Sequence, residues 1–250
     1  MIDPFGRAVT YLRVSVTDRC DFRCVYCMAE NMTFLPKKDI LTLEELDRLC
    51  SVFIEKGVKK LRLTGGEPLV RRNIMSLFEN LSRHLKSGAL EELTLTTNGS
   101  LLPQQSRALA DAGLGRITVS LDSLDDAVFR AMNDVDFPVS EVLAGIDAAA
   151  AVGLTPVKVN MVVKRGVNSG GILPMAEHFR GTGHVVRFIE FMDVGMSNGW
   201  RLDDVVPAQE ILDTIAARYP IEPVEPNYTG EVAGRWRYSD GAGEIGVITS

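Results

Sequence analysis

The sequence is poor in histidine, in aromatic residues and in positive charge. It has 3 histidines, 7% aromatic residues and a formal net charge of -6, with 27 Lys and Arg against 33 Asp and Glu. Because the balance is acidic and no basic stripe is interleaved with aromatics, we do not expect a nucleic-acid polymer as partner. Any phosphate group would have to be met by a few local arginines and lysines.

Long hydrophobic runs and a charged, then apolar, leader are also missing. A bilayer requires about 20 consecutive apolar residues, and no such stretch occurs in the chain, which opens with Met-Ile-Asp-Pro-Phe-Gly. We therefore expect a cytoplasmic protein with no membrane partner. With 250 residues, 46% of them hydrophobic, the chain can bury a sizeable core.

Cysteine is scarce, but three of the 4 cysteines fall in one short loop. Cys20, Cys24 and Cys27 stand in the run Cys-Asp-Phe-Arg-Cys-Val-Tyr-Cys. Three thiolates at this spacing can hold three irons of a 4Fe-4S cluster and leave the fourth iron open for chemistry. The alternatives are a structural zinc site, which needs a distant fourth ligand, a disulfide, or simple packing. The remaining Cys50 lies in a helical apolar pattern and is predicted to pack in the core.

Short β-branched segments alternate with longer helical ones, which is the pattern of repeated βα units. Strands are predicted near residues 10–16, 59–64, 91–97, 115–121, 156–163 and 185–191. Helices are predicted near residues 43–56, 70–86, 103–112, 139–152 and 170–180, with glycines 57, 113 and 153 at helix ends. Six such units predict an α/β fold, an open or partial (βα)6 barrel, over residues 1–192. Residues 193–250 are predicted to add a short C-terminal extension, with a helix near 207–218 and a hairpin at 235–248.

One face of the predicted strands is repeatedly polar. Strands of a parallel barrel are normally apolar on both faces. A barrel centre lined with charges cannot be dry, because an unpaired buried charge is costly, so we expect water and a polar ligand there. The alternative is that these are solvated outer faces of an open sheet. Side chains alternate along a strand, and the polar ones that share a side are Arg13 with Ser15, Arg62 with Thr64, Thr94 with Thr96, Thr118 with Ser120 and Asp122, and Lys158 with Asn160.

The motif Thr-Gly-Gly-Glu-Pro at residues 64–68 follows one of these strands. Two glycines after a strand let the backbone approach a ligand closely, and Glu67 supplies a carboxylate beside exposed amides. That combination suits an ammonium group. The alternative is an ordinary turn that begins a helix.

Taken together, these motifs resemble the radical S-adenosylmethionine (radical SAM) superfamily, whose fold is a full or partial βα barrel. The cysteine motif, with Tyr26 before its last cysteine, and the motif at 64–68 carry this resemblance. Nearly the whole chain further resembles the molybdenum cofactor biosynthesis protein A family, the GTP 3',8-cyclases. The segments that carry it are residues 3–7, 12–20, 62–69, 96–99, 120–123, 158–160 and 187–192.

The resemblance implies a reaction in which S-adenosylmethionine is cleaved reductively and GTP is cyclised to (8S)-3',8-cyclo-7,8-dihydroguanosine 5'-triphosphate, with no side chain acting as general base. It implies an external electron donor and a downstream cofactor-biosynthesis protein as partners, and a homodimer is open. The cysteines Cys20, Cys24 and Cys27 are implied as cluster ligands. Contacts to S-adenosylmethionine are implied for Tyr26, Gly66, Ser120 and Met192, with Glu67 a candidate for its ammonium. Contacts to GTP are implied for Arg13, Arg62, Thr96 and Lys158, with Thr96 chosen over Thr97 by strand parity.

One departure from the family concerns a second cysteine triad, which binds another 4Fe-4S cluster in full-length members. The chain stops at Ser250, close to where that segment would begin, and its cysteine count leaves room for one cluster. We expect either truncation before the second-cluster region or a short variant. Two alternative functions stay open: a radical SAM enzyme that acts on another small molecule or a peptide, and a non-catalytic iron-sulfur or zinc-binding module.

Overall fold

The structure is a computed structural model and describes residues 1–28, 32–194, 199–227 and 231–249. The chain forms two compact units. The first consists of Met1–Asp21, Thr33–Thr118 and Ala144–Leu154, and the second of Phe22–Met32, Val119–Leu143 and Thr155–Ser250. Among the described residues, none of the helices combines the length and hydrophobicity that crossing a bilayer demands.

The first unit contains three parallel strands, β1 (Tyr11–Ser15), β2 (Lys60–Thr64) and β3 (Glu92–Thr97), paired in that order. Their register sets Arg13 opposite Arg62, and Arg62 opposite Thr94. Two residues of the predicted polar face are therefore neighbours across β1 and β2, next to a threonine of β3.

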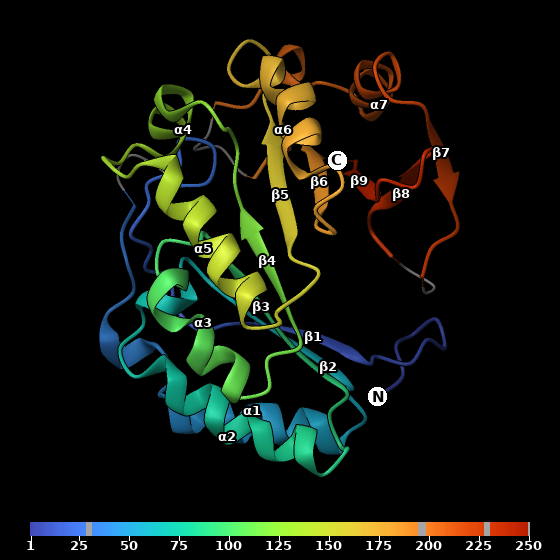
Figure 1. The fold of residues 1–250 in the computed structure, drawn as a ribbon. Helices are drawn as coiled ribbons and strands as arrows, with labels where there is room; N and C mark the ends of the chain where they lie inside the picture. The colour runs from blue at the N-terminus through green and yellow to red at the C-terminus, as the bar shows by residue number, and fades with distance from the viewer. Residues whose placement is uncertain (29–31, 195–198, 228–230, 250) are drawn as a thin grey trace. The chain divides into compact units, whose positions relative to one another are not determined.

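Helices of the first unit follow these strands. They are α1 (Leu43–Glu55), α2 (Ile74–Lys86) and α3 (Leu102–Asp111), with short 3-10 turns at Lys37–Asp39 and Pro68–Val70. Helix α1 packs against α2, and α2 against α3 (Figure 1). A capping box starts α1, because Thr42 and Glu45 exchange side-chain and backbone hydrogen bonds of 3.1 and 2.7 Å. Cys50 on α1 is 0% exposed, so its predicted place in the core is confirmed.

Strand β4 (Arg116–Ser120) and helix α5 (Val139–Ala151) carry the chain between the units. In the second unit β5 (Lys158–Val163) and β6 (Val185–Glu190) are parallel, and β9 (Glu244–Ile248) runs parallel to β6. Strands β8 (Gly234–Tyr238) and β7 (Ile221–Val224) continue the order as antiparallel neighbours. The predicted hairpin is confirmed as β8 and β9, and it extends the sheet of this unit.

Helices of the second unit are α4 (Asp126–Asn133), α6 (Ile172–Phe179) and α7 (Ala208–Ala216), with 3-10 turns at Ser169–Gly171 and Leu202–Asp204. The predicted strands and helices are confirmed to within a few residues. Helix α4 and strand β7 were not predicted. The division predicted between residues 1–192 and 193–250 stays a prediction.

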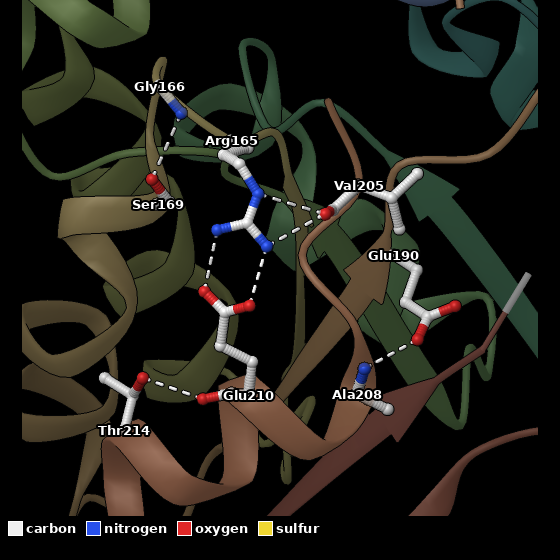
Figure 2. Close-up of polar contacts among 8 residues, drawn as sticks. All are labelled: Arg165, Gly166, Ser169, Glu190, Val205, Ala208, Glu210 and Thr214. Carbon is white, nitrogen blue, oxygen red and sulfur yellow. Dashed lines mark hydrogen bonds and ion pairs between the residues drawn. The ribbon is translucent and has the colours of Figure 1, made fainter. Parts of the chain in front are cut away.

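Polar contacts fix the start of α7 within the second unit (Figure 2). The Arg165 guanidinium, in the loop after β5, donates to both carboxylate oxygens of Glu210 at 2.8 and 2.6 Å and to the Val205 carbonyl at 3.1 and 3.3 Å. Glu190 at the end of β6 accepts a 2.6 Å hydrogen bond from the Ala208 N–H, the first residue of α7. This hydrogen bond connects β6 to α7, and a carboxylate at a helix N-terminus is favourable.

The alternation of polar and apolar strand faces is confirmed in each unit. Leu61, Leu63, Leu93, Leu95, Val159 and Met161 are all 0% exposed. On the opposite side of their strands Arg13 and Ser15 are exposed, and Arg62, Thr96 and Lys158 are half-buried. Thr94, Thr118 and Asp122 are exceptions, since each is at most 2% exposed. The Thr94 hydroxyl donates to the Leu61 carbonyl at 3.1 Å.

Candidate functional site

The predicted site residues are divided between the two units. The first unit carries Arg13, Cys20, Arg62, Gly66, Glu67 and Thr96. The second unit carries Cys24, Tyr26, Cys27, Ser120, Lys158 and Met192.

In the first unit, the glycine loop after β2 lies against the backbone that leads into Cys20. The Gly66 N–H donates to the Thr17 carbonyl, and the Glu67 N–H to the Arg19 carbonyl, both at 2.8 Å. A Cβ atom on Gly66 would lie 2.3 Å from the Arg19 carbonyl oxygen, closer than any atom tolerates. Within this unit the glycine loop thus lies close to the chain's own backbone, and its predicted approach to a ligand stays a prediction.

Glu67 is buried in this loop and is 1% exposed. Its Oε1 accepts hydrogen bonds from the Leu69 N–H at 2.9 Å and the Thr97 hydroxyl at 2.8 Å, and its Oε2 accepts one from the Asn98 N–H at 2.6 Å. Burial raises the pKa of Glu67 to about 7, although these hydrogen bonds act in the opposite direction. Glu67 therefore fastens the loop after β2 to the end of β3, and its contact with an ammonium group stays a prediction.

The end of β3 also holds the residue that follows Cys20. Asn98 donates to one Asp21 carboxylate oxygen at 2.7 Å, and the Ser100 hydroxyl donates to the other at 2.6 Å. The Asn98 Nδ2 also lies 3.9 Å from the Cys20 sulfur. Sequence reasoning assigned no role to these three residues; an Asn-Gly pair directly after a strand was the available signal.

Thr96 and Thr97 occupy different environments. Thr97 is 2% exposed and is bonded to Glu67, whereas Thr96 is half-buried on the other side of β3. Strand parity thus separates the two threonines as expected, and the contact of Thr96 with GTP stays a prediction.

In the second unit, the cysteine loop is bound to the last turn of α4. The Arg23 N–H donates to the Asn133 carbonyl and the Val25 N–H to the Met132 carbonyl, both at 2.9 Å. The Cys24 thiol contacts Asn133 Oδ1 at 3.1 Å. Because these partners come from the last turn of a helix that was not predicted, no sequence pattern pointed to them.

Aromatic packing also holds the cysteine loop against α4. Phe22 lies edge-on to Phe129 of α4, with ring centroids 6.1 Å apart, and its ring is 5.3 Å from that of Phe137. Phe22 is 3% exposed and Phe129 is 1% exposed. Residues 22–25 are therefore held by both backbone hydrogen bonds and buried rings.

Tyr26 is held by a buried carboxylate at the end of β4. Its hydroxyl donates to Asp122 Oδ2 at 2.6 Å, and Asp122 Oδ1 accepts from the Val162 N–H at 2.8 Å. Asp122 is 2% exposed, and burial raises its pKa to about 6. Burial first, and the Asp122 charge second, raise the pKa of Tyr26 well above its usual value. Asp122 was predicted only as part of the polar strand face; its contact with the cysteine loop was missed.

Strands β5 and β6 present a second pair of polar residues. Asn160 is opposite Arg187 in the register, and Arg187 Nε donates to Asn160 Oδ1 at 2.9 Å. Lys158 of β5, Ser120 of β4 and Met192 after β6 are each half-buried. The contact of Lys158 with GTP and those of Ser120 and Met192 with S-adenosylmethionine stay predictions.

The donor set of the cysteine loop suits an iron-sulfur cluster, since soft thiolates are the ligands of such clusters. All four cysteines lie in the described part of the chain, and none forms a disulfide. Within residues 1–28, 32–194, 199–227 and 231–249, no group of three or more His, Cys, Asp and Glu side chains is arranged to hold a metal ion. The thiol chemistry and spacing fit the cluster, and its ligation by these cysteines stays a prediction.

Comparison with known proteins adds two family matches. The model of the Radical SAM superfamily matches residues 14–179, and that of Molybdenum Cofactor Synthesis C matches residues 184–250. Relatives resemble the chain over its full length. It is 52% identical over 253 residues to the GTP 3',8-cyclase of Acidothermus cellulolyticus, covering 99% of this chain and 69% of that protein. It is 56% identical over 249 residues to the GTP 3',8-cyclase of Brucella canis, covering 100% and 72%.

Solved structures of low identity share the fold. Streptococcus suis SuiB bound to S-adenosylmethionine matches with a TM-score of 0.67 at 16% identity, over 96% of this chain and 50% of that chain. A radical SAM methyltransferase from Sphaerobacter thermophilus matches with a TM-score of 0.64 at 17% identity, over 83% and 63%. The predicted α/β fold of the radical SAM type is confirmed.

Proposed function

The chain belongs to the GTP 3',8-cyclase family of radical SAM enzymes, and we propose that it cleaves S-adenosylmethionine reductively and cyclises GTP to (8S)-3',8-cyclo-7,8-dihydroguanosine 5'-triphosphate. This reaction belongs to molybdenum cofactor biosynthesis. The observation that carries the proposal is an identity of 52% and 56% to two GTP 3',8-cyclases over 99% and 100% of the chain. The proposal also includes two partners, an external electron donor and a downstream cofactor-biosynthesis protein.

A 4Fe-4S cluster and S-adenosylmethionine are the cofactors that the superfamily implies. Cys20, Cys24 and Cys27 are the proposed ligands of three irons. When bound, the cluster and the cosubstrate supply a carbon radical that can take a hydrogen atom from the ribose of GTP. The second cluster of the family would need other cysteines, because the 4 cysteines of this chain are the loop triad and the buried Cys50.

For the cosubstrate we propose contacts from Tyr26, Gly66, Ser120 and Met192, and a supporting role for Glu67. An ammonium needs hydrogen-bond acceptors, so the backbone group that Gly66 can offer it is the carbonyl oxygen, while the Gly66 N–H donates to the Thr17 carbonyl. The Tyr26 hydroxyl is engaged by Asp122, which leaves its ring and backbone for the cosubstrate. Ser120 ends β4 and Met192 follows β6, and ligands of parallel sheets bind at such carboxyl ends.

For GTP we propose that Arg13, Arg62 and Lys158 neutralise the triphosphate and that Thr96 contacts the nucleotide. Arg13 and Arg62 are opposite each other on β1 and β2, so the two guanidinium groups start from adjacent backbone positions. Charge-assisted hydrogen bonds to phosphate are the strong ones. The task of these side chains is to orient the ribose and to keep water away, because a misplacement of about 1 Å can cost about a hundredfold in rate.

The test uses the anaerobically reconstituted protein, dithionite, S-adenosylmethionine and GTP that carries deuterium at C3'. We expect deuterium in the 5'-deoxyadenosine product and consumption of GTP in step with it. A Cys24→Ala variant is the control and should form no 5'-deoxyadenosine. Formation of 5'-deoxyadenosine by the unaltered protein, without GTP consumption or deuterium transfer, would overturn the proposal in favour of another substrate.

A further inference from the structure

Asn133, the last residue of α4, makes a contact with Cys24 that the proposed reaction does not yet use. Its Oδ1 lies 3.1 Å from the Cys24 sulfur, and the residue is 3% exposed. Its Nδ2 is buried and has no hydrogen-bond partner among the residues that the structure describes. An amide donor buried without a partner is destabilising, so this arrangement calls for a physical explanation.

Binding of iron by the Cys24 sulfur would give this donor a partner. A Cys24 thiol carries a hydrogen and can donate to Oδ1, as in the contact described. A thiolate that binds iron has no hydrogen to donate, and Oδ1 would then face a negatively charged sulfur. A half-turn of the side-chain amide exchanges Oδ1 and Nδ2 in the same volume. Nδ2 then donates to the sulfur, and the buried donor gains an acceptor.

The backbone keeps Asn133 at this distance. The Arg23 N–H donates to the Asn133 carbonyl at 2.9 Å, so the residue before Cys24 is bonded directly to Asn133. The Val25 N–H donates to the Met132 carbonyl at 2.9 Å on the other side of Cys24. These two hydrogen bonds hold the backbone of Cys24 beside the end of α4, so the Asn133 amide starts within reach of the sulfur.

Asn98 near Cys20 is a useful contrast. Its Nδ2 carries two hydrogens and already has two acceptors, an Asp21 carboxylate oxygen at 2.7 Å and the Cys20 sulfur at 3.9 Å. Of these two amides, Asn133 is the one that contacts a cysteine sulfur through its oxygen while its Nδ2 is buried without a partner.

We infer that Asn133 is a positioning residue that donates a hydrogen bond to the Cys24 thiolate in the cluster-bound protein and thereby raises the reduction potential of the cluster. Hydrogen bonds to cluster sulfurs withdraw negative charge and are one of the determinants of the potential. The inference rests on the proposed ligation of iron by Cys24.

The test compares the cluster-loaded unaltered protein with Asn133→Leu, which has a similar shape and no donor, and with Asn133→Asp, which replaces the amide by a carboxylate. Met132→Leu is the matched control, because it conserves volume at the neighbouring buried position. Iron per chain is measured first, and the midpoint potential then by redox titration monitored by electron paramagnetic resonance. We expect both Asn133 variants to have a lower potential than the unaltered protein, and Met132→Leu to leave it unchanged.

A second measurement detects the proposed hydrogen bond directly. In the reduced proteins transferred to deuterated buffer, electron-nuclear double resonance should detect exchangeable deuterons coupled to the cluster, and one of these signals should be lost in Asn133→Leu but kept in Met132→Leu. Equal potentials in iron-loaded Asn133→Leu and the unaltered protein, or the same deuteron signals in both, would overturn the role of Asn133. If the unaltered protein binds no iron, the proposed function fails instead.

Discussion

Replacing Glu67 with Gln should remove a pH-dependent part of the free energy of unfolding. Glu67 is 1% exposed, and burial raises its pKa to about 7 from an ordinary 4.5. Between these two values the folded state keeps the proton that the unfolded chain has lost. Unfolding therefore releases a proton in this window, and stability falls as the pH rises through it.

The size of the effect follows from the shift. Each pKa unit is worth about 1.4 kcal/mol, so the unaltered protein should lose about 2–3 kcal/mol of stability through this group between about pH 5 and about pH 8. Gln does not titrate and removes this loss. Its carbonyl can keep the hydrogen bonds from Leu69 and Thr97, but its amide then meets the Asn98 N–H, a contact of two donors. That mismatch costs about 1–3 kcal/mol at any pH.

The assay is urea unfolding of the cluster-free chain in small pH steps, followed by circular dichroism under reducing conditions. We expect Glu67→Gln to be less stable than the unaltered protein at about pH 5, with the difference shrinking by about 2–3 kcal/mol towards pH 8. Glu79→Gln on the exposed face of α2 serves as control, because that side chain is in solvent. Parallel pH profiles for Glu67→Gln and the unaltered protein would refute the reasoning.

Three further predictions concern the site. Gly66→Ala should weaken S-adenosylmethionine binding by about five- to a hundredfold, because its Cβ would lie 2.3 Å from a backbone oxygen and the loop that carries the proposed contact must shift, at a cost of about 1–3 kcal/mol; equilibrium dialysis checks this, with Gly170→Ala, whose Cβ meets nothing within 4 Å, as control. Lys158→Met should weaken GTP binding by about ten- to a hundredfold, since hydrogen bonds to charged groups contribute about 1.5–3 kcal/mol; calorimetry that finds unchanged GTP affinity would exclude a triphosphate contact. Cys24→Ala should lose most of its iron, whereas Cys50→Ala, altered only in the core, should keep it; equal iron contents in the two variants would contradict the assignment of the ligands.

The sequence alone determined the elements whose signals are local. Six strands and the helices that follow them were predicted within a few residues, because alternation and helical periodicity depend only on residues close together in the sequence. The polar strand faces and the cysteine motif were identified from the sequence in the same way. Family segments spread over nearly the whole chain pointed to the function, and the comparisons confirmed that family.

Tertiary structure decided what depends on distant partners. Helix α4 has 8 residues, too few to be stable by propensity alone, and it forms because Phe129 and Met132 are buried. Strand β7 is short and contains a proline, a combination that argues against a strand until an edge pairing with β8 is available.

The side chains that hold the cysteine loop were decided in the same way. Tyr26 meets Asp122 across 96 residues, and Cys24 meets Asn133 across 109. No sequence period encodes such a separation. Motif spacing therefore identified the cysteines. Only the folded chain shows that Asp122 and Asn133 contact their loop, because hydrogen bonds between remote residues form only after packing has brought their elements together.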